Sequence, residues 1–214
     1  MSWDMNEQMR DYRSKLKYDY GAWIEQILKG KFDDQIWNGY IVTFMFNHIP
    51  GAYDHKCSVM ENAIERVYAT LIRHVVHDSR SKSERKKLPK LYAFPDYPRQ
   101  KMEPFRWEDI TINGGLHYHG VVLIRIDTRL KVGLDMYIKQ YYRHFVKSGG
   151  PLRRIHIEPI DRTPAKAVDY VLKSIEWRIP DSNQMLILPK AVSELPDKGR
   201  KSDQAVIARA LFGL

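Results

Sequence analysis

The spacing of apolar and polar positions predicts strands in three parts of the chain. Residues 40–46 are β-branched and aromatic and end at the turn sequence 47–51, which is typical of a strand. Residues 91–94 form a short apolar run after the basic stretch 80–90, which predicts a charged loop leading into a short strand. Residues 152–158 alternate between apolar and polar side chains, which predicts a half-buried strand.

Four other segments have the apolar spacing of helices. The clearest of them carries apolar pairs every four residues, and others end at glycine or begin with Thr-Pro, which are common helix boundaries. The predicted helices span residues 5–29 (as one or two helices), 59–76, 134–146 and 163–177. The tail over residues 182–214 predicts a proline-containing loop and a final helix near 203–211.

A further strand is predicted around His117 and His119. Successive side chains alternate between the faces of a strand, so the two imidazoles point the same way while Tyr118 points the other way. The apolar run 121–124 that follows predicts a strand covered on both faces and therefore central in its sheet. Two imidazoles on one face of a buried strand can bind one metal ion; alternatively, each is satisfied by hydrogen bonds to its neighbours.

The predicted helix over 163–177 carries a tyrosine and a lysine away from its apolar stripe. The stripe consists of Ala167, Val168, Val171, Leu172 and Ile175. Tyr170 and Lys173 lie off that stripe and, being three residues apart, are neighbours on the helix surface. A phenol is a poor nucleophile unless a cation or a base assists it, and the ammonium of Lys173 could do so. The alternative is a surface tyrosine beside a solvated lysine.

The net positive charge of the chain indicates a negatively charged partner. The chain has 35 Lys and Arg against 26 Asp and Glu, a formal net charge of +9 that favours a polyanion such as nucleic acid. The candidate DNA-binding cations are Arg85, Lys86, Lys87 and Lys166. The single cysteine, Cys57, rules out an internal disulfide and a cysteine-based zinc site. The N-terminus lacks the pattern of a signal peptide, and no apolar run approaches the ~18 residues of a membrane span, so we expect a cytoplasmic protein without a membrane partner.

Three ordered motifs resemble those of the HUH endonucleases, in particular the single-tyrosine rolling-circle replication initiators. They are the strand and turn over 41–47, His117-Tyr118-His119, and Tyr170-Val171-Leu172-Lys173. The resemblance covers residues 38–178. It implies a ferredoxin-like α+β domain over 38–180, with a central antiparallel sheet flanked by helices. The helical extension 1–37 and the tail 181–214 lie outside that domain.

The resemblance also implies a reaction. The two histidines and one further polar side chain would hold Mg²⁺ or Mn²⁺, which polarises the scissile phosphate of single-stranded DNA. Tyr170 would attack the phosphorus with electrostatic help from Lys173, leaving a 5′-phosphotyrosine and a free 3′-hydroxyl. Asp96 is the first choice for the third ligand. The alternatives are Glu108, Asp109, His156 and Glu158.

Replication initiation at an origin-like site of a plasmid or phage in a bacterial cell is the expected task. The chain lacks a Gly-x-x-x-x-Gly-Lys-Ser/Thr fingerprint, so a host helicase would have to unwind the DNA. A relaxase or a single-strand transposase of the same chemistry is an alternative, although the tyrosine follows the histidines as in initiators. From a different class, the rival is a non-catalytic basic protein that binds nucleic acid through cations and aromatic rings.

Overall fold

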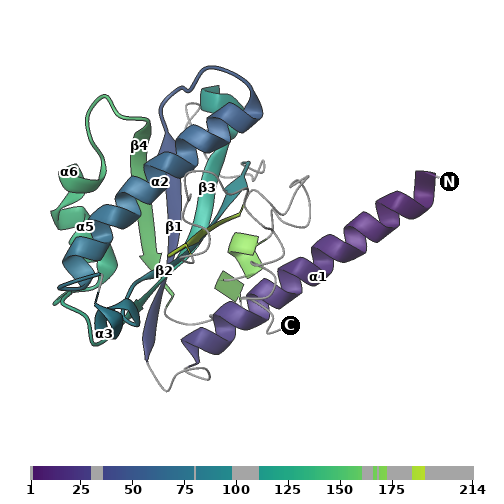
Figure 1. Ribbon diagram of the computed structural model, residues 1–214. Coiled ribbons are helices and arrows are strands. Elements are labelled where there is room, and N and C mark those ends of the chain that lie inside the picture. The colour runs from purple at the N-terminus through teal and green to yellow at the C-terminus, as the bar shows by residue number, and fades with distance from the viewer. Residues whose placement is uncertain are drawn as a thin grey trace.

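The computed structural model describes seven segments of the chain, with residues 2–9 described by their backbone alone: 2–29, 36–79, 81–97, 111–160, 166–167, 169–172 and 185–190. They form one antiparallel sheet with helices on both faces, which confirms the α+β class (Figure 1). The strands are β1 (Trp37–Phe46), β2 (Lys90–Asp96), β3 (His117–Arg125), β4 (Leu152–Pro159) and β5 (Leu186–Leu188). Their order in the sheet is β4-β1-β3-β2-β5.

The helices connect or precede these strands. They are α1 (Ser2–Leu28), α2 (Tyr53–Val75), α3 (Lys82–Arg85), the 3₁₀ turn η1 (Ile112–Gly115), α5 (Leu134–Gln140) and α6 (Tyr142–Phe145). Residues 166–167 and 169–172 are also helical, as predicted. Because α2 joins β1 to β2, and α5 with α6 joins β3 to β4, the central part of the chain follows a β-α-β-β-α-β order.

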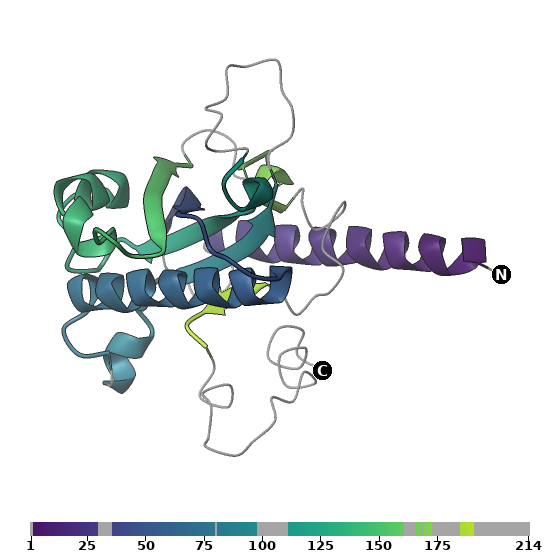
Figure 2. The same ribbon diagram turned by 90° about the horizontal axis from the view of Figure 1, so that it is seen from above.

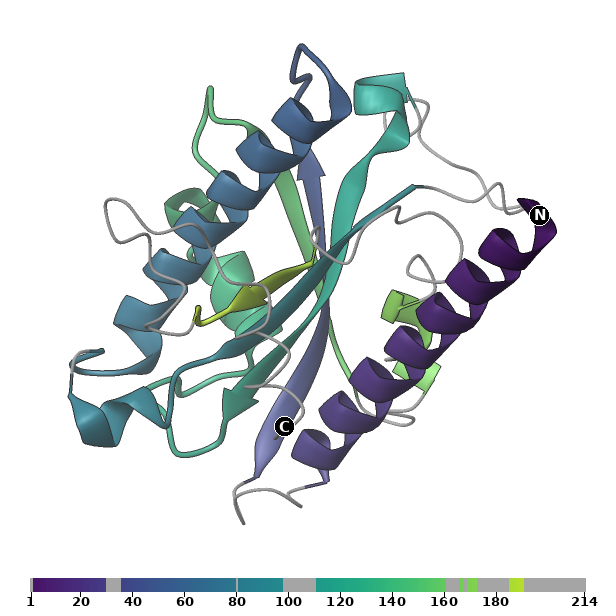
Figure 3. The same cartoon turned by 45° about the vertical axis from the view of Figure 1, so that its right-hand side comes forward.

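Two apolar clusters occupy the two faces of the sheet. The first packs α2, α5 and α6 against one face and includes Val122 and Ile124 of β3. The second packs α1 against the opposite face and includes Val121 and Leu123 of the same strand. Figure 3 shows the sheet between α2 and α1. Every residue of β3 is buried, so the prediction of a central strand covered on both faces is confirmed.

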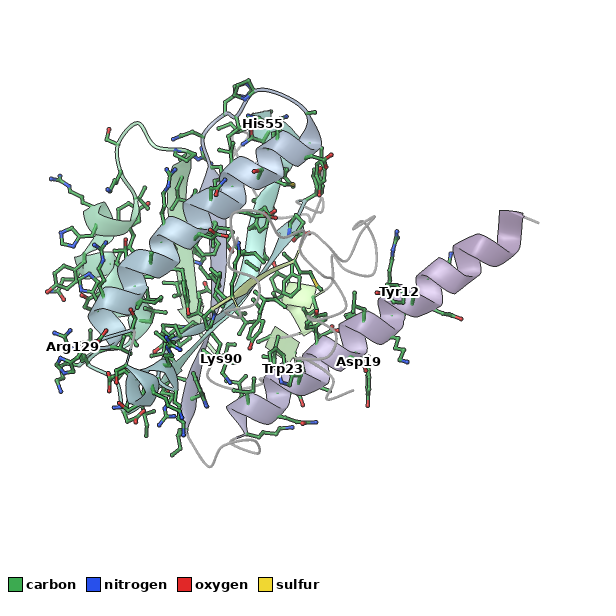
Figure 4. The ribbon with its side chains drawn as sticks, viewed as in Figure 1. Tyr12, Asp19, Trp23, His55, Lys90 and Arg129 are labelled. Atoms are coloured by element: carbon green, nitrogen blue, oxygen red, sulfur yellow. The ribbon has the colours of Figure 1, made fainter. Side chains whose placement is uncertain are left out.

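Helix α1 is a single helix and contributes to the second cluster through its C-terminal half. Ile24 and Ile27 are fully buried, and the Trp23 ring meets that of Tyr92 on β2 edge-on at 4.9 Å between centroids (Figure 4). The N-terminal part of α1 extends beyond the sheet when the molecule is seen from above (Figure 2). Tyr12 on this part is 52% exposed.

Three predictions of secondary structure were wrong in detail. The helix expected over 134–146 is two helices, because Tyr141 leaves the helical backbone conformation (φ −107°, ψ 29°). The basic loop contains the short helix α3. Residues 186–188, expected in a loop, pair with β2 as the edge strand β5, where Leu186 and Leu188 join the core. The helix expected near 203–211 lies outside the described residues.

Among the residues that the structure describes, no helix combines the length and the apolar character that crossing a membrane requires.

Candidate metal centre

Strand register brings a carboxylate opposite the first histidine. Strand β2 pairs antiparallel with β3, and in this register Asp96 lies opposite His117 and Phe94 opposite His119. On the other side of β3, Thr43 of β1 lies opposite His119. Directly paired residues point to the same face of a sheet, so the carboxylate and both imidazoles share the face covered by α1.

Asp96, His117 and His119 form a compact, buried group. Their exposed fractions are 6%, 6% and 8%, and one ligand atom from each lies within 4.8 Å of the others. Two ligands at roughly 2.1 Å from one ion can be no more than about 4.2 Å apart. Small side-chain rotations would therefore close the group around an ion. Two imidazoles and one carboxylate can hold a divalent metal ion, and three protein ligands leave further coordination positions open.

A backbone hydrogen bond orients the His117 ring. Its Nδ1 lies 2.8 Å from the carbonyl oxygen of Gly115, so this ring nitrogen carries the proton and donates it. The other ring nitrogen, Nε2, faces Asp96 at 3.8 Å from Oδ2. A ring N–H bound to a backbone carbonyl is the usual support of a metal-ligating histidine.

His119 is positioned by β1 and by its neighbour on β3. Its Nε2 lies 3.5 Å from Oγ1 of Thr43, and its ring meets that of His117 at 4.8 Å between centroids and 64° between planes. Thr43 was not predicted as part of the site, because the pairing of distant strands is not visible in the sequence.

A buried asparagine fixes the turn that leads into the histidine strand. Asn113 has φ 58°, and Gly114 and Gly115 also have positive φ. The side-chain oxygen of Asn113 accepts a hydrogen bond from the backbone N–H of Ile49 at 2.8 Å, while its amide donates to the carbonyl of Asn47 at 2.9 Å. Asn113 thereby ties the entry to β3 to the turn after β1. An Asn-Gly-Gly sequence favours such a left-handed turn, although this turn was not predicted.

The opposite face of β3 carries a partly buried polar pair, Tyr118 and Glu61. The Tyr118 hydroxyl donates to Oε1 of Glu61 on α2 at 2.9 Å. Burial raises the pKa of Glu61 above its usual range and outweighs the lowering effect of that hydrogen bond. Burial also raises the pKa of the Cys57 thiol, so Cys57 is a packing residue rather than a nucleophile.

Tyr170 lies beside the candidate metal ligands. Its ring contacts that of His119 edge-on, at 5.7 Å between centroids and 65° between planes. Its side chain is 39% exposed, whereas Val171 and Leu172, next to it on the same helical segment, are buried in the second apolar cluster. The prediction that Tyr170 lies off the apolar stripe is therefore confirmed.

Helix α1 supports this tyrosine segment. Lys17 forms an ion pair of 2.7 Å with Asp169, the residue before Tyr170. Tyr20 and Ile24 of α1 belong to the same apolar cluster as Val171 and Leu172. The sequence did not reveal this role, since nothing in a helical pattern indicates which distant segment covers it.

The other candidate residues fall in different places. Lys173, Glu108 and Asp109 lie outside the described residues. His156 and Glu158 are exposed on the edge strand β4 and bond to each other at 2.8 Å, which is the solvent-facing pair expected as their alternative.

The candidate DNA-binding cations are divided between two regions. Lys166 is exposed on the tyrosine segment. Arg85, Lys86 and Lys87 precede β2, whose first residue pairs with Leu123 and thus lies at the far end of β3 from the histidines. Lys87 forms an ion pair with Glu84 at 3.1 Å.

Comparison of the chain with protein-family models, with curated proteins and with solved structures gave no match. The chemistry of the candidate metal-binding group and the tyrosine beside it is therefore the basis for inferring what the protein does.

Proposed function

We propose that the protein is a metal-dependent endonuclease that nicks and rejoins single-stranded DNA through Tyr170. The observation that carries this proposal is the contact between the rings of Tyr170 and His119. His119 belongs to a group of three buried side chains that could hold a metal ion. Tyr170 is 39% exposed beside that group, which leaves room for a substrate next to its ring.

Each residue has a distinct part in the proposed reaction. Asp96, His117 and His119 would hold the ion, which when bound withdraws charge from a phosphate oxygen and makes phosphorus more electrophilic. The Tyr170 oxygen forms a bond to phosphorus as it loses its proton. The bond from phosphorus to the 3′ oxygen breaks, and that oxygen leaves with the electron pair and takes up a proton. The products are a 5′-phosphotyrosine and a free 3′-hydroxyl.

The same steps run in reverse because the phosphotyrosine remains an ester. Attack by a 3′-hydroxyl on the phosphotyrosine restores the DNA backbone and releases Tyr170 without an external energy source. A free 3′ end can also prime synthesis, so we propose replication initiation as the task. The strand order β4-β1-β3-β2 with a β-α-β-β-α-β connection supports a ferredoxin-like HUH domain.

The donor set favours Mn²⁺ over Mg²⁺ within this proposal. Mg²⁺ prefers oxygen ligands and gives up its water reluctantly, whereas transition metals accept imidazole readily. Two of the three ligands here are imidazoles. We therefore propose that Mn²⁺ supports the reaction at lower concentrations than Mg²⁺ does.

The proposal is tested by covalent capture. Wild-type protein is incubated with end-labelled single-stranded DNA of randomised sequence and Mn²⁺, then separated under denaturing conditions. We expect a labelled adduct that EDTA and Tyr170→Phe abolish. Tyr18→Phe is the matched control, because Tyr18 is 75% exposed on α1 and outside the site. DNA binding without any adduct across divalent metals would overturn the enzyme proposal in favour of a non-catalytic binding protein.

A further inference from the structure

A second group of aromatic rings lies on the opposite side of the sheet from the metal centre. His74 near the end of α2 and Tyr137, Tyr141 and His144 of the α5–α6 region form this group, called here the aromatic patch. Figures 1 and 3 show α5 and α6 beside the C-terminal half of α2, with α1 across the sheet.

Three of the rings lie nearly parallel. The planes of His74 and Tyr141 differ by 16°, those of His74 and His144 by 14°, and those of Tyr141 and His144 by 26°, with centroids 5.7 to 6.4 Å apart. His144 is exposed, and Tyr141 is partly exposed. Aligned ring faces at the surface are suited to accept another flat ring, such as a nucleobase.

Cations surround the aromatic patch. Arg73 and Arg129 lie close enough to help lower the pKa of His74, which falls mainly because of burial and next because of His144. Residues 129–147 carry five exposed cations and one acidic residue, Asp135. The cations are Arg129, Lys131, Lys139, Arg143 and Lys147. None of them pairs with a carboxylate in the part of the chain that the structure describes. Figure 4 shows Arg129 at the end of α2 away from His55.

Packing of α5 and α6 on α2 accounts for only part of this arrangement. Ile138 and Phe145 are buried in the first apolar cluster and provide that packing. It does not require His144 to align with Tyr141 at the surface, or the excess of positive charge around them. Rings that accept bases and cations that attract phosphates are the two elements of a single-strand binding surface.

We propose that the aromatic patch is a second binding surface for single-stranded DNA, where bases stack on Tyr141 and His144 and phosphates contact Arg73, Arg129 and Arg143. The proposal depends on the proposed function only for the choice of DNA as the polyanion. The surface would retain one part of a strand while another part reacts at Tyr170. Stacking and phosphate contacts carry little sequence information, so the patch binds DNA of any sequence.

Binding of a fluorescent oligothymidylate of about 20 nucleotides, measured by anisotropy in EDTA, tests the patch without the nicking reaction. We expect Tyr141→Ala/His144→Ala to bind roughly tenfold more weakly, as for the loss of a stacked base. Tyr141→Phe keeps the ring and should bind like wild type. Arg143→Glu should bind more weakly and depend less steeply on salt concentration. Lys15→Glu makes the same charge change at an exposed position on α1 and should alter affinity less than twofold.

Two results would overturn the patch proposal: affinity of the double alanine variant within twofold of wild type, or equal losses in Arg143→Glu and Lys15→Glu. If the double variant fails to fold, Arg143→Glu decides the question, because its side chain is exposed. The two proposals fail separately. Absence of adducts in wild-type protein counts against the nuclease alone, whereas adducts with unimpaired binding by the patch variants count against the patch alone.

Discussion

Replacing Asp96 by asparagine should change the response of the protein to metal more than its stability without metal. Asparagine has nearly the same size but no negative charge. Asp96 is 6% exposed, and its Oδ2 lies 3.8 Å from Nε2 of His117. Asparagine keeps a side-chain oxygen that can accept hydrogen bonds at this position. In EDTA we therefore expect Asp96→Asn to change Tm by less than Mn²⁺ changes it in wild type.

The response to metal should differ much more between the two proteins. Binding at a concentration of 100 times Kd stabilises a protein by about 2.7 kcal/mol. For a chain of this length, each kcal/mol raises Tm by about 2–4 °C, so wild type should gain roughly 5–10 °C. If loss of the carboxylate of this group weakens binding about 100-fold, the variant at the same Mn²⁺ concentration gains about 0.4 kcal/mol, or roughly 1 °C.

Thermal unfolding followed by circular dichroism during a Mn²⁺ titration measures both effects. Asp11→Asn is the control, because it removes one exposed carboxylate from α1 and should keep the full metal response. Equal Mn²⁺-dependent shifts in wild type and Asp96→Asn would refute the assignment of Asp96 to the metal group. No shift in wild type at millimolar Mn²⁺ would refute the metal centre itself.

Three further predictions concern the surroundings of the site. Gly120→Ala places a Cβ 2.5 Å from the carbonyl oxygen of Tyr92, so we expect the free energy of unfolding, measured by chemical denaturation, to fall by roughly 1–3 kcal/mol. An unchanged free energy of unfolding would show that β2 and β3 are not so close. Lys17→Glu should slow adduct formation about two- to fivefold without changing the Mn²⁺-dependent Tm shift. The charge swap Lys17→Glu/Asp169→Lys should restore the rate, and absence of rescue would contradict positioning by this ion pair. Burial raises the pKa of Glu61, so the protonated carboxyl stabilises the folded protein, and this contribution is lost as pH rises through the raised pKa. Glu61→Gln, which cannot ionise, should therefore become more stable relative to wild type as pH rises from 4 to 8. Parallel profiles of stability against pH for the two proteins would contradict this.

Local patterns sufficed to predict most of the fold around β3. The alternation of His117, Tyr118 and His119 predicted which side chains share a face, and the following apolar run predicted a strand with both faces covered. Both are properties of a single strand, so they can be read without knowing its neighbours. The spacing around Tyr170 predicted in the same way which side of the helix stays exposed.

Relations between distant segments could not be predicted with the same certainty. Asp96 was one of several candidates for the third ligand, and the register of β2 against β3 is what places it opposite His117. That register depends on the turn geometry and on packing of the whole sheet. The contact of α1 with the tyrosine segment is also tertiary. The break at Tyr141 was missed because the apolar spacing continues across it, although the backbone does not.

The most direct test of the central claim is identification of the amino acid that carries the DNA. After reaction with Mn²⁺ and single-stranded DNA, the adduct is digested with nuclease and trypsin and analysed by mass spectrometry. We predict a nucleotide 5′-phosphate on peptide 167–173, released by cleavage after Lys166 and Lys173, in which Tyr170 is the only tyrosine. A nucleotide on any other residue, or nicked DNA with this peptide wholly unmodified, would contradict the assignment of Tyr170 as the nucleophile.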